Sequence, residues 1–192
     1  MMTFSSSTLF VAVLSLAAAT AQEAAPKRTP DVPYVPTTEA AVQAMLKLAE
    51  VTKSDIVYDL GCGDGRIVIA AATAVGAHGV GIDINPERIK EAKENARKAG
   101  IEGLVRFEEK DLFEADIHEA SVVTLFLLNS VNLKLRPKLL KDLKPGTRIV
   151  SNTFDMGDWK ALKEIKLEDG NDQDTYLSHK FFLWIVPEPA AK

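Results

Sequence analysis

Residues 56–68 read Ile-Val-Tyr-Asp-Leu-Gly-Cys-Gly-Asp-Gly-Arg-Ile-Val, and the rest of the chain is organised around them. The apolar, β-branched run at 56–60 predicts a buried strand of a parallel sheet, and the alanine-rich apolar run at 67–75 predicts a helix. Between them, Gly61, Gly63 and Gly65 predict a tight turn. A strand, a glycine turn and a helix present backbone N–H groups and a positive helix end to a ligand.

The glycine spacing narrows the kind of ligand. A dinucleotide fingerprint needs a glycine where Arg66 stands, and the Gly-Lys-Ser/Thr of a phosphate-binding Walker loop is missing from the sequence. A second strand is expected at 78–83, and it ends in Asp83, which is suited to bind a ribose diol. The alternative is a tight turn without a ligand. Asp59 and Asp83, each on its expected strand, weigh against that alternative.

Asp-Leu-Gly-Cys-Gly-Asp-Gly at 59–65, followed by Gly-Ile-Asp-Ile-Asn at 81–85, resembles two motifs of class I S-adenosylmethionine (SAM)-dependent methyltransferases. The resemblance implies a Rossmann-like α/β fold. Its mostly parallel seven-stranded sheet would carry helices on both faces and an antiparallel C-terminal hairpin. It also implies SAM as cofactor, with Asp83 on the ribose and Asp111 on the adenine amino group; the alternative for Asp111 is a solvated loop aspartate. The other residues that it assigns to SAM in this stretch are Asp59, Gly61, Gly63, Asp64 and Gly65.

A proline-bounded segment precedes the first expected helix, Pro33-Tyr34-Val35-Pro36-Thr37. By spacing alone it is a rigid lead-in with Tyr34 packed on the domain. Together with residues 59–68, it resembles the ATP synthase c-subunit lysine N-methyltransferase family and its prokaryotic relatives. Eukaryotic members tend to have Ser at position 62 and Glu at position 83. The resemblance implies a lid in which Tyr34 and Thr37 border SAM, and a protein lysine as methyl acceptor.

The second half of the chain should complete the sheet. We expect a strand at 122–128, a helix at 132–143 with Leu133, Leu135, Leu139, Leu140 and Leu143 in the core, a strand at 148–151 and a hairpin at 162–167 and 181–186. Asn129 follows the 122–128 strand, where open α/β sheets bind ligands. Asn129 and Tyr34 are therefore candidates for orienting the acceptor nitrogen, although Asn129 is equally explained as a residue at a helix start. The Pro-Pro-Tyr typical of amide and adenine methylation does not follow it.

Composition limits the partners and the compartment. The chain has a net charge of −4 and no basic stretch, which disfavours nucleic acid as a partner. The resemblance implies a protein substrate, and we expect no metal. Its one cysteine, Cys62, excludes an internal disulfide. The expected organisation is a signal peptide at 1–21, a disordered leader at 22–31, the methyltransferase domain at 32–186 and a tail at 187–192.

Two questions stay open at this point. The signal peptide predicts export to the periplasm, although SAM is made in the cytoplasm. The alternatives to a lysine methyltransferase are a small-molecule or RNA methyltransferase and a SAM-binding protein without activity.

Overall fold

The computed structural model describes residues 29–167 and 180–188, in which seven strands form one sheet in the order β3-β2-β1-β4-β5-β7-β6. β1 to β5 run parallel, whereas β7 pairs antiparallel with β5 and β6. This confirms the expected Rossmann-like α/β class with its antiparallel C-terminal strands. The strands are β1 (Ile56–Leu60), β2 (His78–Asp83), β3 (Val105–Glu109), β4 (Val122–Leu125), β5 (Arg148–Asn152), β6 (Lys163–Lys166) and β7 (Lys180–Ile185).

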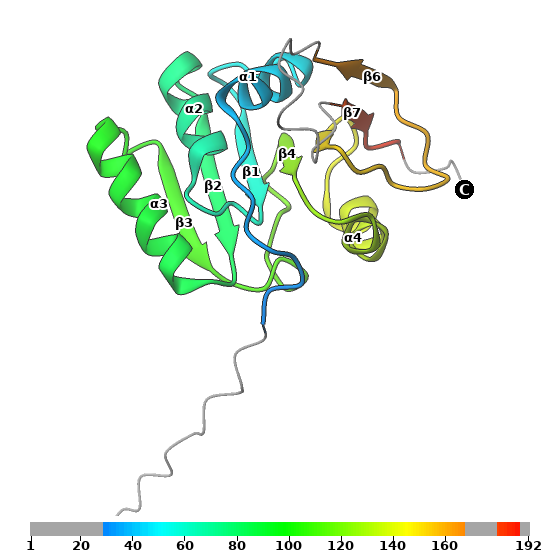
Figure 1. The fold of residues 1–192 in the computed structure, drawn as a ribbon. Coiled ribbons are helices and arrows are strands. Elements are labelled where there is room, and N and C mark those ends of the chain that lie inside the picture. Colours follow the sequence, from blue (N-terminus) through cyan, green and yellow to red (C-terminus); the bar gives the residue numbers. More distant parts are fainter. Residues whose placement is uncertain (1–28, 168–179, 189–192) are drawn as a thin grey trace, which may run out of the picture.

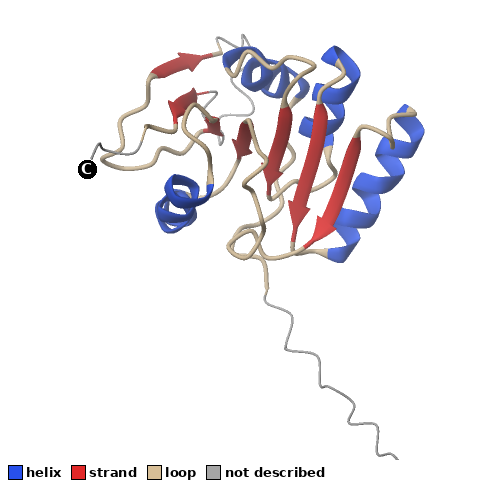
Figure 2. Ribbon diagram, turned by 180° about the vertical axis from the view of Figure 1, so that it is seen from behind, coloured by secondary structure: helices blue, strands red, loops and turns tan. Residues whose placement is uncertain are grey.

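In the described part of the chain, four helices cover the sheet: α1 (Glu39–Leu48), α2 (Arg66–Val75), α3 (Pro86–Ala99) and α4 (Asn129–Asp142). The first three share one buried cluster with one face of the sheet, and α4 is the only helix of the described residues on the other face (Figures 1 and 2). Local signals place the helix ends. Asn85 caps α3 through a 2.9 Å bond from the Glu87 backbone N–H, and Gly100 ends it in a left-handed conformation.

The strand expected at 122–128 is shorter in the structure. β4 ends at Leu125, which lies opposite Leu60, the last residue of β1. Beyond that point β1 turns away into the glycine loop, so residues 126–128 lose their ladder partner on that side. They run instead into α4, which begins at Asn129 rather than at Asn132.

The expected core face of α4 was partly wrong. Val131, Leu135 and Leu139 are buried, but Leu133 and Leu140 are 41% and 40% exposed. Leucines occupy both faces of this helix, and periodicity alone does not say which face meets the sheet.

The expected signal peptide and most of the leader lie outside the described residues, as do most of the connection between the two hairpin strands and the end of the tail. None of the described helices is long and apolar enough to cross a membrane.

Candidate active site

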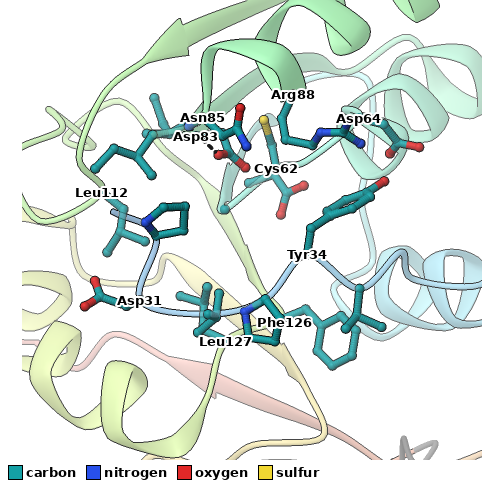
Figure 3. A pocket seen from close by; sticks show the side chains of 18 of the residues that line it. Asp31, Tyr34, Cys62, Asp64, Asp83, Asn85, Arg88, Leu112, Phe126 and Leu127 are labelled. Atoms are coloured by element: carbon teal, nitrogen blue, oxygen red, sulfur yellow. Dashed lines mark hydrogen bonds between the residues drawn. The ribbon is translucent and has the colours of Figure 1, made fainter. Parts of the chain in front are cut away.

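The strands β1, β2 and β4 end at a cavity of ≈ 280 Å³, close to the lower limit of typical small-ligand sites. Its floor includes Asp59 and Gly61 from β1 and the following turn, Asp83 from β2, and Phe126 and Leu127 after β4. Opposite this floor, the cavity is bounded by residues 29–37, which we call the strap (Figure 3). The cavity therefore lies where parallel α/β sheets bind ligands.

The turn between β1 and α2 requires its glycines. Gly61, Gly63 and Gly65 have φ angles of +88°, +52° and +80°, in the left-handed region that side chains disfavour. A Cβ on Gly63 would lie 2.3 Å from Cε2 of Tyr34, and one on Gly65 would lie 2.7 Å from Cε1 of Phe107. Gly61 lines the cavity, whereas Gly63 lies beneath the Tyr34 ring and Gly65 packs against β3.

Asp83 joins β2 to the glycine turn. Its Oδ2 accepts from the Gly63 backbone N–H and its Oδ1 from that of Asn85, both at 2.9 Å. These two bonds hold the carboxylate at the cavity wall, and a carboxylate oxygen can accept further bonds from a ligand hydroxyl. Asp83, the residue predicted to bind ribose, thus lies in the cavity wall.

Asp59 is buried at the cavity floor. Burial raises its pKa to about 7; the Thr124 hydroxyl, which donates to Oδ1 at 2.8 Å, lowers it, and the charges of Asp83 and Asp64 add to the rise. A cationic ligand group beside this carboxyl would favour its ionised form. Burial also raises the pKa of the Cys62 thiol well above its usual value, so Cys62 is packed rather than reactive.

Arg66 ties the strap to the glycine turn. Its guanidinium donates to both carboxylate oxygens of Asp64, at 2.9 and 2.6 Å, and to the backbone carbonyl of Thr37 at 2.6 Å. Burial would raise the pKa of Asp64, but the bonds from Arg66 outweigh it and the pKa is lowered. Asp64 is thus a structural anion at this wall, and Thr37 is buried beside it.

Tyr34 occupies the middle of the strap. Its ring packs on Gly63 on one side, and the Arg88 guanidinium lies 4.7 Å from its centroid (Figure 3). Burial and the charge of Asp64 raise the pKa of Tyr34, so its hydroxyl is protonated at neutral pH. Tyr34 is 44% exposed and lines the cavity. Its contacts with Gly63 and Arg88 agree with a lead-in packed on the domain, and its place in the cavity lining agrees with a lid.

Of the remaining predicted residues, one lies in the cavity wall and one does not. Asp111 lines the cavity, and its Oδ1 accepts from the Phe113 backbone N–H at 2.9 Å. Asn129, the first residue of α4, is absent from the lining. Its side-chain amide donates to Asp155 Oδ1 at 2.8 Å. This placement favours the alternative reading of Asn129 as a helix-start residue.

Sequence reasoning missed several cavity residues. The run at 122–128 was assigned wholly to a strand, which concealed Phe126 and Leu127 as cavity floor. Two cations at this edge also have a signal in the sequence. Arg66 comes directly after the glycine turn, and Arg88 lies in the first turn of the helix that follows Asp83.

Comparison with known proteins places the chain. The family model described as the ANTKMT methyltransferase domain matches residues 59–163, more than half of the chain. A protein-lysine N-methyltransferase of Saccharolobus islandicus (strain REY15A) is 50% identical over 160 residues, covering 83% of this chain and 96% of that protein. The mouse adenine nucleotide translocase lysine N-methyltransferase is 35% identical, and the match spans only 57% of its length.

A solved structure agrees with the fold and the donor. The chain superposes with a TM-score of 0.75 on a protein described as an RNA methyltransferase from Salinibacter ruber, in complex with S-adenosyl-L-homocysteine (SAH). The two are 51% identical, and the match covers 82% of this chain and 97% of that one. The fold, the cavity at the strand ends and these matches together show that the chain is a SAM-dependent methyltransferase and belongs to the ANTKMT methyltransferase-domain family.

Proposed function

We propose that this enzyme methylates the side-chain amine of lysine in a protein. The observation that carries the proposal is the 50% identity, over almost the whole length of the relative, to a protein-lysine N-methyltransferase. In this proposal the acceptor lysine enters the cavity beside the strap and the residues that follow β4.

In this proposal each group of SAM has a partner in the cavity wall. Asp83 accepts bonds from the ribose hydroxyls, and Asp111, next to Leu112 in the lining, accepts one from the adenine amine. The buried carboxylate of Asp59 receives the ammonium group of the donor's methionine part. Gly61 lines the cavity and carries no side chain, so a ligand can approach the backbone of the turn closely.

SAM supplies an electrophilic methyl group, so the protein's task is to position the acceptor amine and keep it neutral. Neutralising a lysine of pKa near 10.4 at pH 7 costs about 4.6 kcal/mol. A cationic donor next to a partly desolvated amine favours the neutral form and lowers that cost. Tyr34 and Phe126 line the cavity and offer aromatic faces to the lysine methylenes, and the Tyr34 hydroxyl offers an acceptor to the nitrogen. A dedicated strong base is therefore not required.

RNA is the competing acceptor, because the Salinibacter ruber relative is described as an RNA methyltransferase. The net charge of −4 disfavours it, since phosphate contacts dominate nucleic-acid affinity. The cavity lining is also acidic on balance, with five aspartates against two arginines and one lysine. An acidic lining repels the phosphates of an RNA acceptor.

Calorimetry with SAH tests the donor site, comparing the parent with Asp83→Ala and with Asp116→Ala, an exposed aspartate outside the lining. We expect affinity to fall at least about tenfold, or about 1.4 kcal/mol, in Asp83→Ala alone. Methyl transfer from labelled SAM to a cell extract then tests the acceptor. We expect protease to remove the label and ribonuclease to leave it, and we expect mass spectrometry to find the methyl group on lysine. Label on RNA would replace the proposal, and binding without transfer would favour a non-catalytic protein.

We also propose that residues 1–21 direct export, as their apolar run and small residues before Gln22 suggest. Expression of the full chain in a bacterial host, followed by fractionation and N-terminal sequencing, tests this. A periplasmic product starting at Gln22 is expected, and an uncleaved cytoplasmic product would reject export.

A further inference from the structure

The outward face of α4 differs from that of the other helices. Leu133, Pro137 and Leu140 follow the i, i+4, i+7 spacing of one helix face and are exposed. Lys134, Lys138 and Lys141 form a parallel row one residue further along. A helix that is apolar on both faces indicates that its outer face has a partner as well.

Helix α3 provides the internal comparison. Its exposed positions carry charges of both signs, such as Glu87, Lys93, Glu94 and Lys98, and no large apolar side chain. In α4 the only acid is Asp142, and Lys138 neutralises it at 2.6 Å. The combination of exposed leucines with an excess of lysines is therefore specific to α4.

Most of this face of α4 is uncovered, although Leu133 lies beside Gly157 and the Lys134 amine lies 4.3 Å from the centroid of the Phe113 ring. In the described part of the chain, no helix lies between β3 and β4 or between β5 and β6, so α4 has no helical neighbour on its side of the sheet (Figure 1). The apolar row also lies near the active site, because Val131, in the first turn of α4, lines the cavity. Leu128, just before the helix, is 41% exposed and extends the apolar surface toward that end.

We propose that this face, which we call the α4 face (Leu133, Lys134, Pro137, Leu140, Lys141 and, after the helix, Lys144), docks on an anionic lipid membrane. Lysines attract the negative surface, and leucines beside them enter the boundary between headgroups and acyl chains. Nucleic acid fits less well, because it rewards lysine but not exposed leucine. Docking would bring the cavity, at the α4 start, close to acceptors held at the membrane surface.

Co-sedimentation of the full chain with lipid vesicles tests the proposal without relying on methyl transfer. The vesicles are equimolar phosphatidylglycerol and phosphatidylcholine, or phosphatidylcholine alone. Residues 9–19 are themselves apolar, so the test compares variants of the same full chain. Lys141→Glu with Lys144→Glu alters the α4 face, and Lys93→Glu with Lys98→Glu on α3 makes the same change in net charge. Leu133→Gln with Leu140→Gln removes the apolar row, and unchanged unfolding midpoints confirm that each variant folds.

We expect the parent to prefer the anionic vesicles, and the α4 charge variant to lose about tenfold or more in affinity for them. The leucine variant should also bind these vesicles more weakly than the parent, whereas the α3 variant should lose much less affinity. Equal losses in the α3 and α4 charge variants, or no preference of the parent for anionic vesicles, would overturn the proposal. So would an α4-dependent affinity for an RNA oligonucleotide in place of vesicles, or a dimer in light scattering that only the leucine variant abolishes.

Discussion

Replacing Gly63 by alanine should displace the Tyr34 ring and so weaken donor binding. The new Cβ would lie 2.3 Å from Cε2 and 2.9 Å from Cδ2 of that ring, which is too close for either atom to remain. Alanine must also adopt a φ of +52°, which costs about 1–2 kcal/mol relative to the ordinary helical region. The substitution thus has a backbone cost and a displacement cost, and they can be separated.

Gly100→Ala isolates the backbone cost. Gly100 has a φ of +70°, and a Cβ there would meet nothing within 4 Å. Both alanine variants gain the same small benefit from a less flexible unfolded chain. The difference between their free energies of unfolding therefore measures the displacement of the ring.

The displacement should cost little stability, because Tyr34 is half exposed and can swing outward without leaving a core cavity. Its main loss is the contact with Arg88, worth about 0.5–1 kcal/mol at an exposed site. We expect Gly63→Ala to be less stable than Gly100→Ala by that amount in urea unfolding. SAH affinity should fall about tenfold, or about 1.4 kcal/mol, in Gly63→Ala and hardly at all in Gly100→Ala.

A double-mutant cycle with Tyr34→Ala decides whether the ring is the cause. If Gly63→Ala acts by moving the ring, the double variant binds SAH no more weakly than Tyr34→Ala alone, because the ring is already gone. Additive losses of affinity would mean that the two residues act separately. That result, or unchanged SAH binding by Gly63→Ala, would refute the lid reading of the strap.

Three further changes test the surroundings of the site. Because burial raises the pKa of Asp59 to about 7, the folded state binds an extra proton between pH 4 and 7, and the contribution of this group to stability falls as pH rises through that range. The free energy of unfolding of Asp59→Asn in urea should therefore rise relative to that of the parent over the same range. A difference between the two that does not change with pH would contradict this. Asp55 is buried and paired with Arg148 at the opposite edge of the sheet, and its pKa is lowered despite its burial. Asp55→Asn should therefore lower the free energy of unfolding by about 3 kcal/mol at pH 7, and by less as pH falls below about 4, while SAH affinity stays unchanged. Arg66→Lys cannot bridge Asp64 and the strap in the same geometry, and calorimetry should show weaker SAH binding with nearly parental stability.

The donor side of the site could be predicted because its residues lie at the carboxyl ends of strands or in the turn that follows. Asp59 is the second-last residue of β1 and Asp83 the last of β2, and the ends of these neighbouring parallel strands meet at one edge whatever the helices do. The glycine turn needs positive φ angles that few other residues adopt, so its sequence is narrowly restricted. Backbone geometry alone therefore brought these groups together.

The acceptor side could not be predicted in the same way. Whether Phe126 belongs to a strand or to a cavity floor depends on where its neighbour β1 ends, which is a tertiary fact. The bond from Arg66 to the Thr37 carbonyl joins residues 29 positions apart, and no local pattern indicates it. Leu133 and Leu140 were assigned to the core because a period of 3.6 residues cannot distinguish two apolar faces of one helix.

These differences separate what the two sides of the site must recognise. The donor is the same molecule throughout a methyltransferase family, so its contacts can rest on strand ends and a glycine turn. The acceptor varies, and among the described residues we expect the strap, the residues after β4 and the start of α4 to select it. Specificity should therefore change through positions 126 and 131 and the outer face of α4, and leave Asp59 and Asp83 unaltered. Exchanging residues 29–33 of the strap for those of the Saccharolobus islandicus relative, with Tyr34 and Thr37 kept, should alter which proteins are labelled while SAH affinity stays within about threefold of the parent.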